Sequence, residues 1–398
     1  MDNKTGAGAK LVAFLKKAAD ALRPHTLIIA AFTLLFSLFT FTMAQQRPGD
    51  ASPPPSDTAA QTPSPSGQAP SGQPPSEQPP EQPSEQPPEQ TAYNPLTGEA
   101  LPSGSGPARR PTAVVLNNLN RALPMSGVSY ADVIYEVLAE GGITRMLGVY
   151  YNPDALEKIG TVRSARTYYL ELALGHDAIF VHAGGSYLVY DKIAEWGVAT
   201  LDYVNGGAYA SELAWRDPDR VANVGLEHSV YTSGERVAKA AERAHITAES
   251  QGFEQGWVFA PGVSAGSVRA SGVNVHFTRN KTTRFQYDSA AGVYTAWQYD
   301  AVFYDEAASR PVTVANVAVL HTDVTAVPGD AEGRLDVRLT GAGTGYIASG
   351  GTAAAIAWRK DSRTAPLVFT YEDGGEVTLA EGKTYICVIG ENMQVDFA

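Results

Sequence analysis

The stretch GTVRSARTYYLELALGHDAIFVHAGGS, residues 160–186, decides the fold of the folded part of this chain. It contains two units of one design, each a short apolar run followed by a small-residue turn and a helical pattern. A strand is expected at 178–182, and helices are expected at 164–174 and 187–196. Strands and helices that alternate in this way are typical of an α/β domain.

The two turns carry residue types that bind anions. They hold Arg163, Ser164, Arg166, His182, Gly184, Gly185 and Ser186. A helix N-terminus offers free backbone N–H groups and the positive end of a dipole, and glycine lets a ligand approach closely. Arginines at a helix start are unfavourable unless an anion is present. The sequence therefore predicts a phosphate or carboxylate pocket, although ion pairs with nearby acids and a satisfied core histidine stay open as alternatives.

Three further residues are candidates for this pocket. Glu140 and Arg145 flank the Gly-Gly turn of a hairpin predicted over residues 132–151, and His228 precedes a helix opened by a capping box at 232–235. An exposed ion pair is the alternative for Glu140 and Arg145. A metal site of His182, His228 and Glu140 has no supporting ligand spacing. No metal or cofactor motif is present, so none is predicted.

The pattern changes near Pro261. Short alternating runs such as VNVHF, YTAWQYD and TYICVIG recur between Gly-rich turns, which predicts an antiparallel all-β domain, a sandwich or a barrel. The single cysteine, Cys387, lies in one of these runs and is expected to be buried. The expected fold is thus a mixed α+β or α/β domain at 93–260, followed by an antiparallel all-β domain at 261–398.

The first 92 residues have a different character. Residues 26–44, TLIIAAFTLLFSLFTFTMA, carry no charge and follow five basic residues, which predicts a single-pass transmembrane anchor. Residues 1–25 would then be cytoplasmic and the C-terminal domains extracellular. A signal peptide cleaved near Ala44, giving a secreted protein, is the alternative. Residues 48–90 hold 14 of the 26 prolines, so 45–92 is predicted to be a disordered Pro/Gln/Glu/Ser-rich linker.

Charge limits the class of partner. The net charge of −12 divides into +4 over residues 1–47 and −6 over residues 48–90, which leaves −10 for residues 91–398. Nucleic-acid binding needs clustered positive charge, so an acidic folded region argues against nucleic acid as a partner. A local basic pocket remains compatible with this composition.

Several blocks of the chain resemble the YerB-type family of bacterial envelope lipoproteins. They are VVLNN, ADVIYEVLAEGGITRML, IGTVRSARTYY, VHAGGS and EHSVYTS, and the later strands resemble the C-terminal domain of that family. The resemblance covers roughly residues 94–392. It implies an envelope-facing protein of Gram-positive-type bacteria with two domains of unknown function. The lipid-modified cysteine of the family is absent here, and the apolar segment at 26–44 takes its place.

Two functions follow from these features. The first is a membrane-anchored extracytoplasmic protein whose pocket binds an anionic cell-wall component, such as peptidoglycan or a wall glycan, or another envelope protein. The second is an enzyme, a transferase or hydrolase of phosphorylated wall-glycan precursors. In the enzyme, Arg163, Arg166 and Arg145 would hold phosphates, and Asp132 or Glu140 would act as base or bind Mg²⁺. The sequence holds no recognised catalytic set, which favours binding.

Overall fold

The structure is a computed structural model that describes residues 92–102 and 108–398. The cytoplasmic segment predicted at 1–25, the transmembrane anchor predicted at 26–44 and nearly all of the linker predicted at 45–92 lie outside the described residues. Within the described residues, no helix is both long enough and apolar enough to cross a membrane.

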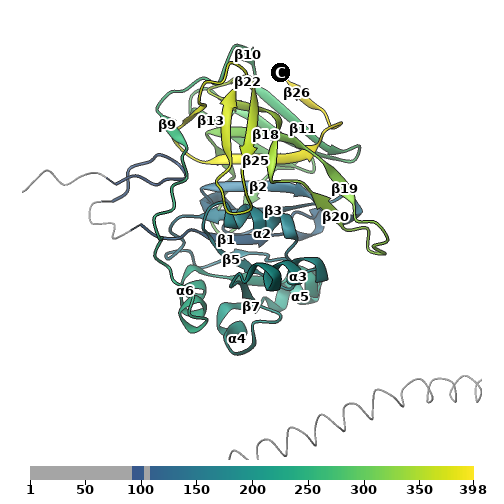
Figure 1. The fold of residues 1–398 in the computed structure, drawn as a ribbon. Helices are drawn as coiled ribbons and strands as arrows, with labels where there is room; N and C mark the ends of the chain where they lie inside the picture. Colours follow the sequence, from purple (N-terminus) through teal and green to yellow (C-terminus); the bar gives the residue numbers. More distant parts are fainter. Residues whose placement is uncertain (1–91, 103–107) are drawn as a thin grey trace, which may run out of the picture. The chain divides into compact units, whose positions relative to one another are not determined.

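One mixed sheet of eleven strands forms the centre of the described chain (Figure 1). Its order is β10-β22-β21-β18-β25-β2-β3-β1-β5-β6, and β23 pairs with β22 beside this path. The strands are β1 (Thr112–Leu116), β2 (Val133–Leu138), β3 (Thr144–Tyr150), β5 (Ile179–His182), β6 (Leu201–Asp202), β10 (Val268–Arg269), β18 (Asn316–Thr322), β21 (Gly341–Ser349), β22 (Thr352–Lys360), β23 (Val368–Tyr371) and β25 (Thr384–Gly390). The central strands β1 and β3 are buried along their whole length and are mostly apolar, although β3 also buries Thr144 and Arg145.

Strands from both predicted domains share this sheet. β2 pairs in parallel with β25, so that Glu136 lies opposite Cys387, and β25 pairs in parallel with β18. Cys387 is buried and unpaired, as predicted. The hairpin predicted over 132–151 is confirmed as the antiparallel pair β2 and β3. The prediction of an antiparallel all-β domain at 261–398 is wrong in this respect, because β18 and β25 pair in parallel within a sheet shared with the N-terminal part. Nothing local in the sequence indicates which distant strand lies beside β2.

A second, antiparallel sheet covers part of the central one. Its order is β14-β13-β12-β11-β26, with β17 beside β13. Its strands are β11 (Gly272–Thr278), β12 (Lys281–Asp288), β13 (Val293–Gln298), β14 (Ala301–Val302), β17 (Thr313–Val314) and β26 (Val395–Phe397). Phe285 of β12 meets Tyr385 of β25 edge to face, with ring centres 4.9 Å apart. The two sheets therefore share a hydrophobic core.

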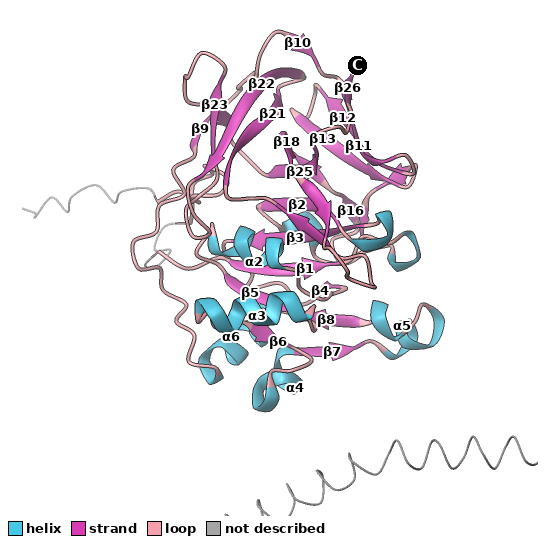
Figure 2. Ribbon diagram, turned by 45° about the vertical axis from the view of Figure 1, so that its right-hand side comes forward, coloured by secondary structure: helices cyan, strands magenta, loops and turns pink. Residues whose placement is uncertain are grey.

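The remaining elements are short. The helices are α2 (Thr167–Leu174), α3 (Tyr187–Trp196), α4 (Ala210–Leu213), α5 (Pro218–Asn223), α6 (Gly234–Arg243) and the 3-10 turns η1 (Asn120–Ala122), η2 (Val128–Tyr130), η3 (Glu140–Gly142), η4 (Gly207–Tyr209) and η5 (Leu226–His228). The small sheets pair β4 (Ile159–Gly160), β8 (Val230–Thr232) and β7 (Ala214–Arg216); β9 (Val258–Ala260) and β24 (Thr378–Ala380); β15 (Tyr304–Asp305) and β16 (Arg310–Pro311); and β19 (Val324–Ala326) and β20 (Leu335–Val337). Figure 2 shows helices around the N-terminal part of the central sheet, while the C-terminal part consists of strands and loops. The predicted contrast between a mixed α/β part and a β part is thus confirmed at this coarse level.

The helix ends show where local sequence signals succeed. The Ser186 hydroxyl caps α3 by accepting a hydrogen bond from the Val189 N–H at 3.3 Å, and Gly197 ends the helix with a φ of 63°. Helix α2 begins at Thr167 rather than at Ser164 as predicted. The Ser164 hydroxyl instead donates to the Ala183 carbonyl at 3.1 Å, because residues 163–165 are extended. Tertiary pairing therefore overrides the capping preference of this serine.

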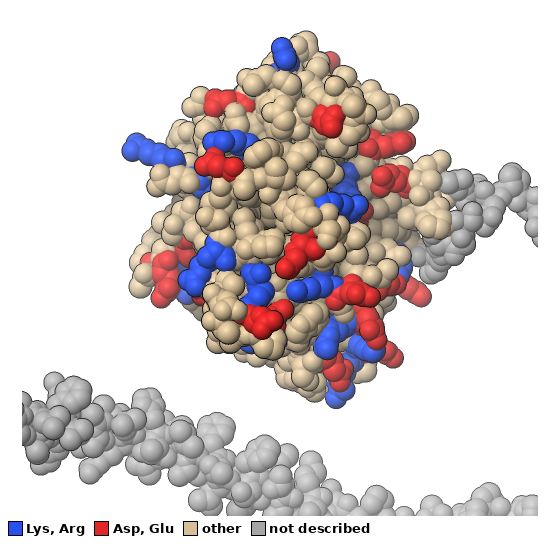
Figure 3. All heavy atoms as spheres, turned by 180° about the vertical axis from the view of Figure 1, so that it is seen from behind, with Lys and Arg blue, Asp and Glu red and all other residues tan. Residues whose placement is uncertain are grey.

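The strand directions define one edge where ligands are expected. β5 and β6 run parallel to β1, and β18 and β25 run parallel to β2. Because β1 and β2 are both antiparallel to β3, all six strands end at the same edge of the sheet. The carboxyl edge of a parallel sheet is where α/β folds usually bind ligands. On the face in Figure 3, basic and acidic side chains are interspersed without a broad basic patch.

Candidate functional site

The two predicted turns lie side by side at this carboxyl edge. The Ala183 N–H donates to the Arg163 carbonyl at 3.0 Å, and the Ala165 N–H donates to the Gly184 carbonyl at 2.9 Å. Residues 163–165 and 183–186 therefore form one paired unit rather than two separate helix starts. The two turns therefore lie next to each other, as a common pocket requires. They contact each other through backbone hydrogen bonds like those between two strands.

Three of the candidate residues pair with one another. Arg145 Nη2 lies 2.9 Å from Glu140 Oε1, while Arg166 Nε lies 3.1 Å from Glu140 Oε2 and its Nη2 contacts Oε1. Burial raises the pKa of Glu140, but the two guanidinium groups outweigh it and hold the pKa at about 2. Both arginines are almost fully buried. Arg145, Arg166 and Glu140 thus form a closed ion-pair cluster and do not line the pocket.

Arg163 differs from its two neighbours. No carboxylate of the described residues lies within 4.0 Å of its guanidinium, and its Nη1 lies 3.0 Å from His228 Nδ1. Burial, and then the nearby charge of Arg145, lower the pKa of Arg163 to about 10. The carboxylates of Glu227 and Glu140 act on Arg163 only from beyond ion-pair distance, and a largely buried cation without a directly paired carboxylate is costly in the folded protein. Arg163 is therefore the side chain that would gain most from a bound anion.

A pocket of about 370 Å³ opens beside Arg163. Its lining residues are Val162, Arg163, Ser164, Ala183, Gly184, Gly185, Tyr190, Val204, Asn205, Arg216, Glu227 and Val230. The backbone N–H groups of Ser164 and Gly185 have no hydrogen-bond acceptor among the described residues. Arg216 is held by the Leu226 carbonyl and by the Ser229 hydroxyl, the latter at 3.3 Å. Two guanidinium groups and two free N–H groups thus lie around one concave space.

His182 supports the pocket wall rather than lining it. It is fully buried, with Nδ1 2.8 Å from the Gly184 carbonyl and Nε2 3.1 Å from the Thr200 hydroxyl. Nδ1 therefore carries the proton, and burial lowers the pKa of His182 so that the ring stays neutral. His182 is thus a buried histidine with both ring nitrogens hydrogen-bonded, which was the alternative to a ligand-binding role in the sequence analysis. Ser186 is likewise used as the cap of α3.

Asp202 holds the wall of the pocket beside Arg163 in place, a role that the sequence analysis did not predict. Its Oδ1 accepts from the Gly184 N–H at 2.7 Å and from the Val204 N–H at 2.8 Å, while its Oδ2 accepts from the Tyr190 hydroxyl at 2.7 Å. Burial raises the pKa of Asp202, but the hydrogen bonds from the Tyr190 hydroxyl and from the Gly184 and Val204 N–H groups lower it, and the pKa lies below its usual value. The only local signal was that Asp202 ends a short strand, β6, at the carboxyl edge.

His228 lies behind Arg163. Its Nδ1 is 2.9 Å from Asn117 Nδ2 and 3.0 Å from Arg163 Nη1, and since both partners are donors, Nδ1 is the acceptor. Its Nε2 lies 3.1 Å from Glu227 Oε1. Burial, and then Arg163, lower the pKa of His228. A neutral His228 thus orients Arg163 without adding positive charge.

The residues proposed for metal binding or acid–base chemistry are engaged elsewhere. His182, His228 and Glu140 each have the partners given above, and no group of three or more His, Cys, Asp or Glu in the described chain could hold a metal. Asp132 lies at the opposite edge of the sheet, where it accepts from the Tyr151 N–H at 2.6 Å and from Asn94 Nδ2 at 2.9 Å. With a pKa of about 2, Glu140 is unsuited to be a general base.

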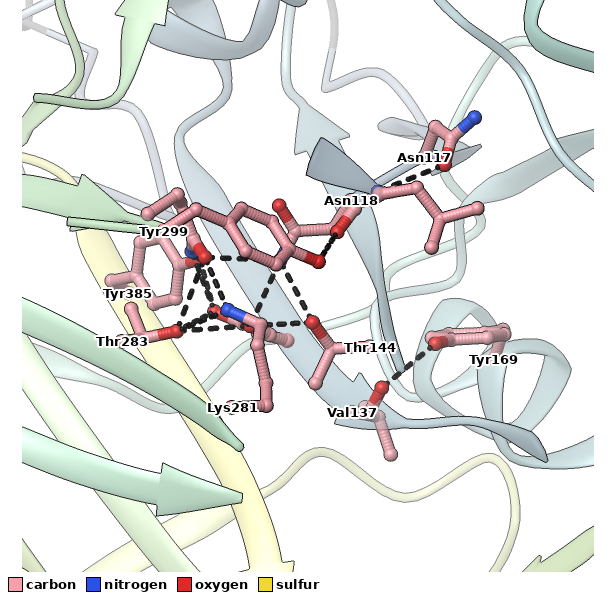
Figure 4. Close-up of polar contacts among 12 residues, drawn as sticks. Asn117, Asn118, Val137, Thr144, Tyr169, Lys281, Thr283, Tyr299 and Tyr385 are labelled. Atoms are coloured by element: carbon pink, nitrogen blue, oxygen red, sulfur yellow. Dashed lines mark hydrogen bonds and ion pairs between the residues drawn. The ribbon is translucent and has the colours of Figure 1, made fainter. Parts of the chain in front are cut away.

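A second buried polar cluster joins the two sheets. Glu136 on β2 is fully buried, and its carboxylate lies 3.0 Å from Lys281 Nζ and 2.6 Å from the Tyr385 hydroxyl. Thr144 and Thr283 donate to it at 2.7 and 2.9 Å. Figure 4 shows Lys281 and Thr283 of β12, Tyr385 of β25 and Thr144 of β3 converging on this point. Asn118 Nδ2 also donates to Glu136 Oε1 at 2.9 Å, whereas Asn118 Oδ1 has no partner in the described chain. The cluster connects the two sheets through polar contacts.

Comparisons with known proteins find one family. The N-terminal domain of DUF3048, described as a protein of unknown function, matches residues 96–247, and its C-terminal domain matches residues 273–386. A Bacillus subtilis (strain 168) protein named "Putative lipoprotein YerB" is 32% identical over 285 residues, covering 71% of this chain and 81% of that protein. A crystal structure of the YerB protein from Bacillus subtilis is 28% identical with a TM-score of 0.65, covering 77% of this chain and 99% of that one.

These comparisons correct the predicted location. The sequence analysis predicted a single-pass membrane protein with an anchor at 26–44. The matched relative is named "Putative lipoprotein YerB" and not a membrane-spanning protein. The single-pass prediction is therefore wrong. The reason is that an apolar run of 19 residues after basic residues is also what a signal segment contains, so length and charge alone do not separate the two.

Proposed function

This chain belongs to the DUF3048 family of the lipoprotein-like YerB protein, and from that premise we propose that it is a cell-envelope protein that binds an anionic group. The ligand is a phosphate or carboxylate carried by a larger envelope molecule, such as peptidoglycan or a wall glycan, or by an envelope protein. The pocket beside Arg163 is the binding site. Binding, rather than catalysis, is the function that its residues support best.

One observation carries this proposal. Arg163 is largely buried beside Arg145 and Arg166, yet no carboxylate of the described chain pairs with it. It lines a pocket together with Arg216 and the free N–H groups of Ser164 and Gly185. An anion there would accept charge-assisted hydrogen bonds, which are about twice as strong as neutral ones. The pocket thus offers charged and neutral donors to an anion, and its own carboxylate, Glu227, lies beyond ion-pair distance of Arg163.

The pocket also has features suited to a larger ligand. Tyr190 and Asn205 offer a hydroxyl and an amide at its wall, and Glu227 offers an exposed carboxylate. A free inorganic anion would leave most of the 370 Å³ empty. A phosphate or carboxylate that is part of a sugar or peptide would place its uncharged remainder against these groups.

Replacing Arg163 by Met is expected to weaken phosphate binding at least tenfold without unfolding the protein. The substitution removes the unpaired cation but keeps most of the apolar volume, and it relieves repulsion with Arg145. A ligand that binds only the folded state raises the melting temperature. The measurement is the thermal shift produced by inorganic phosphate, compared with chloride at equal ionic strength.

Arg359→Met is the matched control, because Arg359 is exposed and pairs with Asp361 at the surface. Phosphate should stabilise this variant as it stabilises the wild-type chain. Repeating the titration with acetate and with a short peptide ending in a free carboxylate distinguishes a carboxylate ligand from a phosphate. An equal phosphate shift in wild type and Arg163→Met would remove the proposed site.

A further inference from the structure

A second pocket, of about 590 Å³, lies at the opposite edge of the central sheet. One wall is the turn at Tyr93–Gly98, which the Asn94 side chain ties to Asp132 just before β2. The other wall is the segment 253–259, which lies between the two residue ranges matched by the family domains. This pocket is therefore separate from the anion site, which lies where the parallel strands end.

Aromatic side chains in this pocket are fixed in place. Trp257 stacks on Phe369 with ring centres 5.9 Å apart and an angle of 26°, and its indole N–H donates to the Leu367 carbonyl at 2.7 Å. Phe259 meets Trp257 edge to face at 6.3 Å. Tyr93 adds a ring that is 60% exposed. These partly open rings offer flat apolar surface at little conformational cost.

The polar groups of the pocket include both acceptors and a donor. Glu254 and Glu381 supply carboxylates, and among the described residues none that lines the pocket is Lys, Arg or His. Gln255 is only 4% exposed; its Oε1 lies 2.6 Å from His176 Nδ1, whereas its Nε2 has no hydrogen-bond partner in the described chain. Gln255 also borders a small cavity of about 40 Å³ next to the pocket. Gln255 Nε2 is closed off from solvent, and the adjoining cavity is large enough to hold a water, so this side chain supports the pocket wall.

We infer that this pocket binds a pyranose unit of a neutral glycan. The apolar face of the sugar ring packs on Trp257 and Tyr93, and sugar hydroxyls donate to Glu254 and Glu381. The absence of a basic residue from the described lining argues against an anionic ligand.

The test is calorimetric titration of the 398-residue chain with cellotetraose and with the tetrasaccharide of N-acetylglucosamine. We expect at least one of them to bind, and we expect Tyr93→Ala to weaken that binding at least fivefold. Tyr93 is exposed, so its truncation leaves the fold intact. Tyr304→Ala, which removes a tyrosine that is 44% exposed elsewhere, should bind as the wild type does.

A second variant tests the polar side of the pocket. Glu254→Gln keeps the shape and removes one charge, so it should weaken sugar binding only severalfold. Arg163→Met should not change it, which separates this inference from the proposed anion site. Lack of binding by both tetrasaccharides at millimolar concentration would overturn the inference. Binding of tetramethylammonium that Glu254→Gln abolishes would overturn it as well, since the pocket would then hold cations.

Discussion

Replacing Lys281 by Met is expected to lower the free energy of unfolding by about 3–5 kcal/mol. Lys281 is 3% exposed and its Nζ lies 3.0 Å from Glu136 Oε1, which is itself fully buried. Methionine keeps the length of the side chain but leaves the Glu136 carboxylate without its cation. Removal of one partner from a buried pair is costly because the remaining charge stays away from water. The same cluster joins the two sheets, so its loss affects the whole described unit.

The measurement is chemical denaturation of the variant and the wild-type chain at pH 7. Lys239→Met is the matched control, because Lys239 and Glu235 form an exposed pair whose removal should cost less than about 0.5 kcal/mol. The double variant Lys281→Met with Glu136→Gln should regain part of the loss, since no charge remains buried. A loss for Lys281→Met no larger than that for Lys239→Met would contradict the expectation.

The same variant should show a distinct dependence on pH. In the wild-type chain, burial raises the pKa of Glu136, but Lys281 and the hydroxyl donors outweigh it and hold the pKa below its usual value. Without Lys281, the folded pKa of Glu136 should rise above that of the unfolded chain. The folded variant then binds the extra proton, so its stability deficit should shrink as the pH falls from 7 to 5.

Much of the fold follows from local sequence. TAVVL is a buried strand, the Gly-Gly turn at 141–142 closes the hairpin of β2 and β3, and Ser186 and Gly197 bound α3. Each depends on residues within about ten positions of one another. The pairing of β2 with β25 does not, because some 250 residues separate the two strands. The run TYICVIG is one indication in the sequence, because its apolar side chains point to both faces of the strand. Such a strand is covered on both faces, unlike an edge strand of an antiparallel sheet.

In the candidate site, too, some features follow from local sequence and others depend on distant contacts. Arg163, Ser164, Gly184 and Gly185 line the pocket because they belong to the two turns that the sequence identified. Whether an arginine in such a turn forms an ion pair depends on acidic residues far away in the sequence. Arg166 pairs with Glu140, which lies 26 positions before it. Arg216 joins the pocket from β7 by folding alone. Local sequence thus indicated where the proposed anion site lies, and tertiary contacts decide which arginine is left without a paired carboxylate.

Acidification from pH 7.5 to pH 4.5 is expected to remove about 2.5 kcal/mol from the free energy of unfolding through His176 alone. His176 is 2% exposed, with Nδ1 2.6 Å from Gln255 Oε1 and Nε2 2.7 Å from the Tyr135 hydroxyl. The neutral ring satisfies both contacts by donating through Nδ1 and accepting through Nε2. A second proton would leave the Tyr135 hydroxyl without its acceptor and would place a charge in the core.

The sign follows from the two pKa values of this group. Burial lowers the pKa of His176 to about 4 in the folded chain, whereas an unfolded histidine titrates near 6.5. Between these values the unfolded chain binds a proton that the folded chain does not, so stability falls as the pH falls and is fully retained above 6.5. Urea denaturation of the wild-type chain and of His176→Gln at pH 7.5, 5.5 and 4.5 measures the effect. The variant should be the less stable protein at pH 7.5 and should lose about 2.5 kcal/mol less on acidification. Parallel losses in the two proteins would show that His176 is not held neutral in the core.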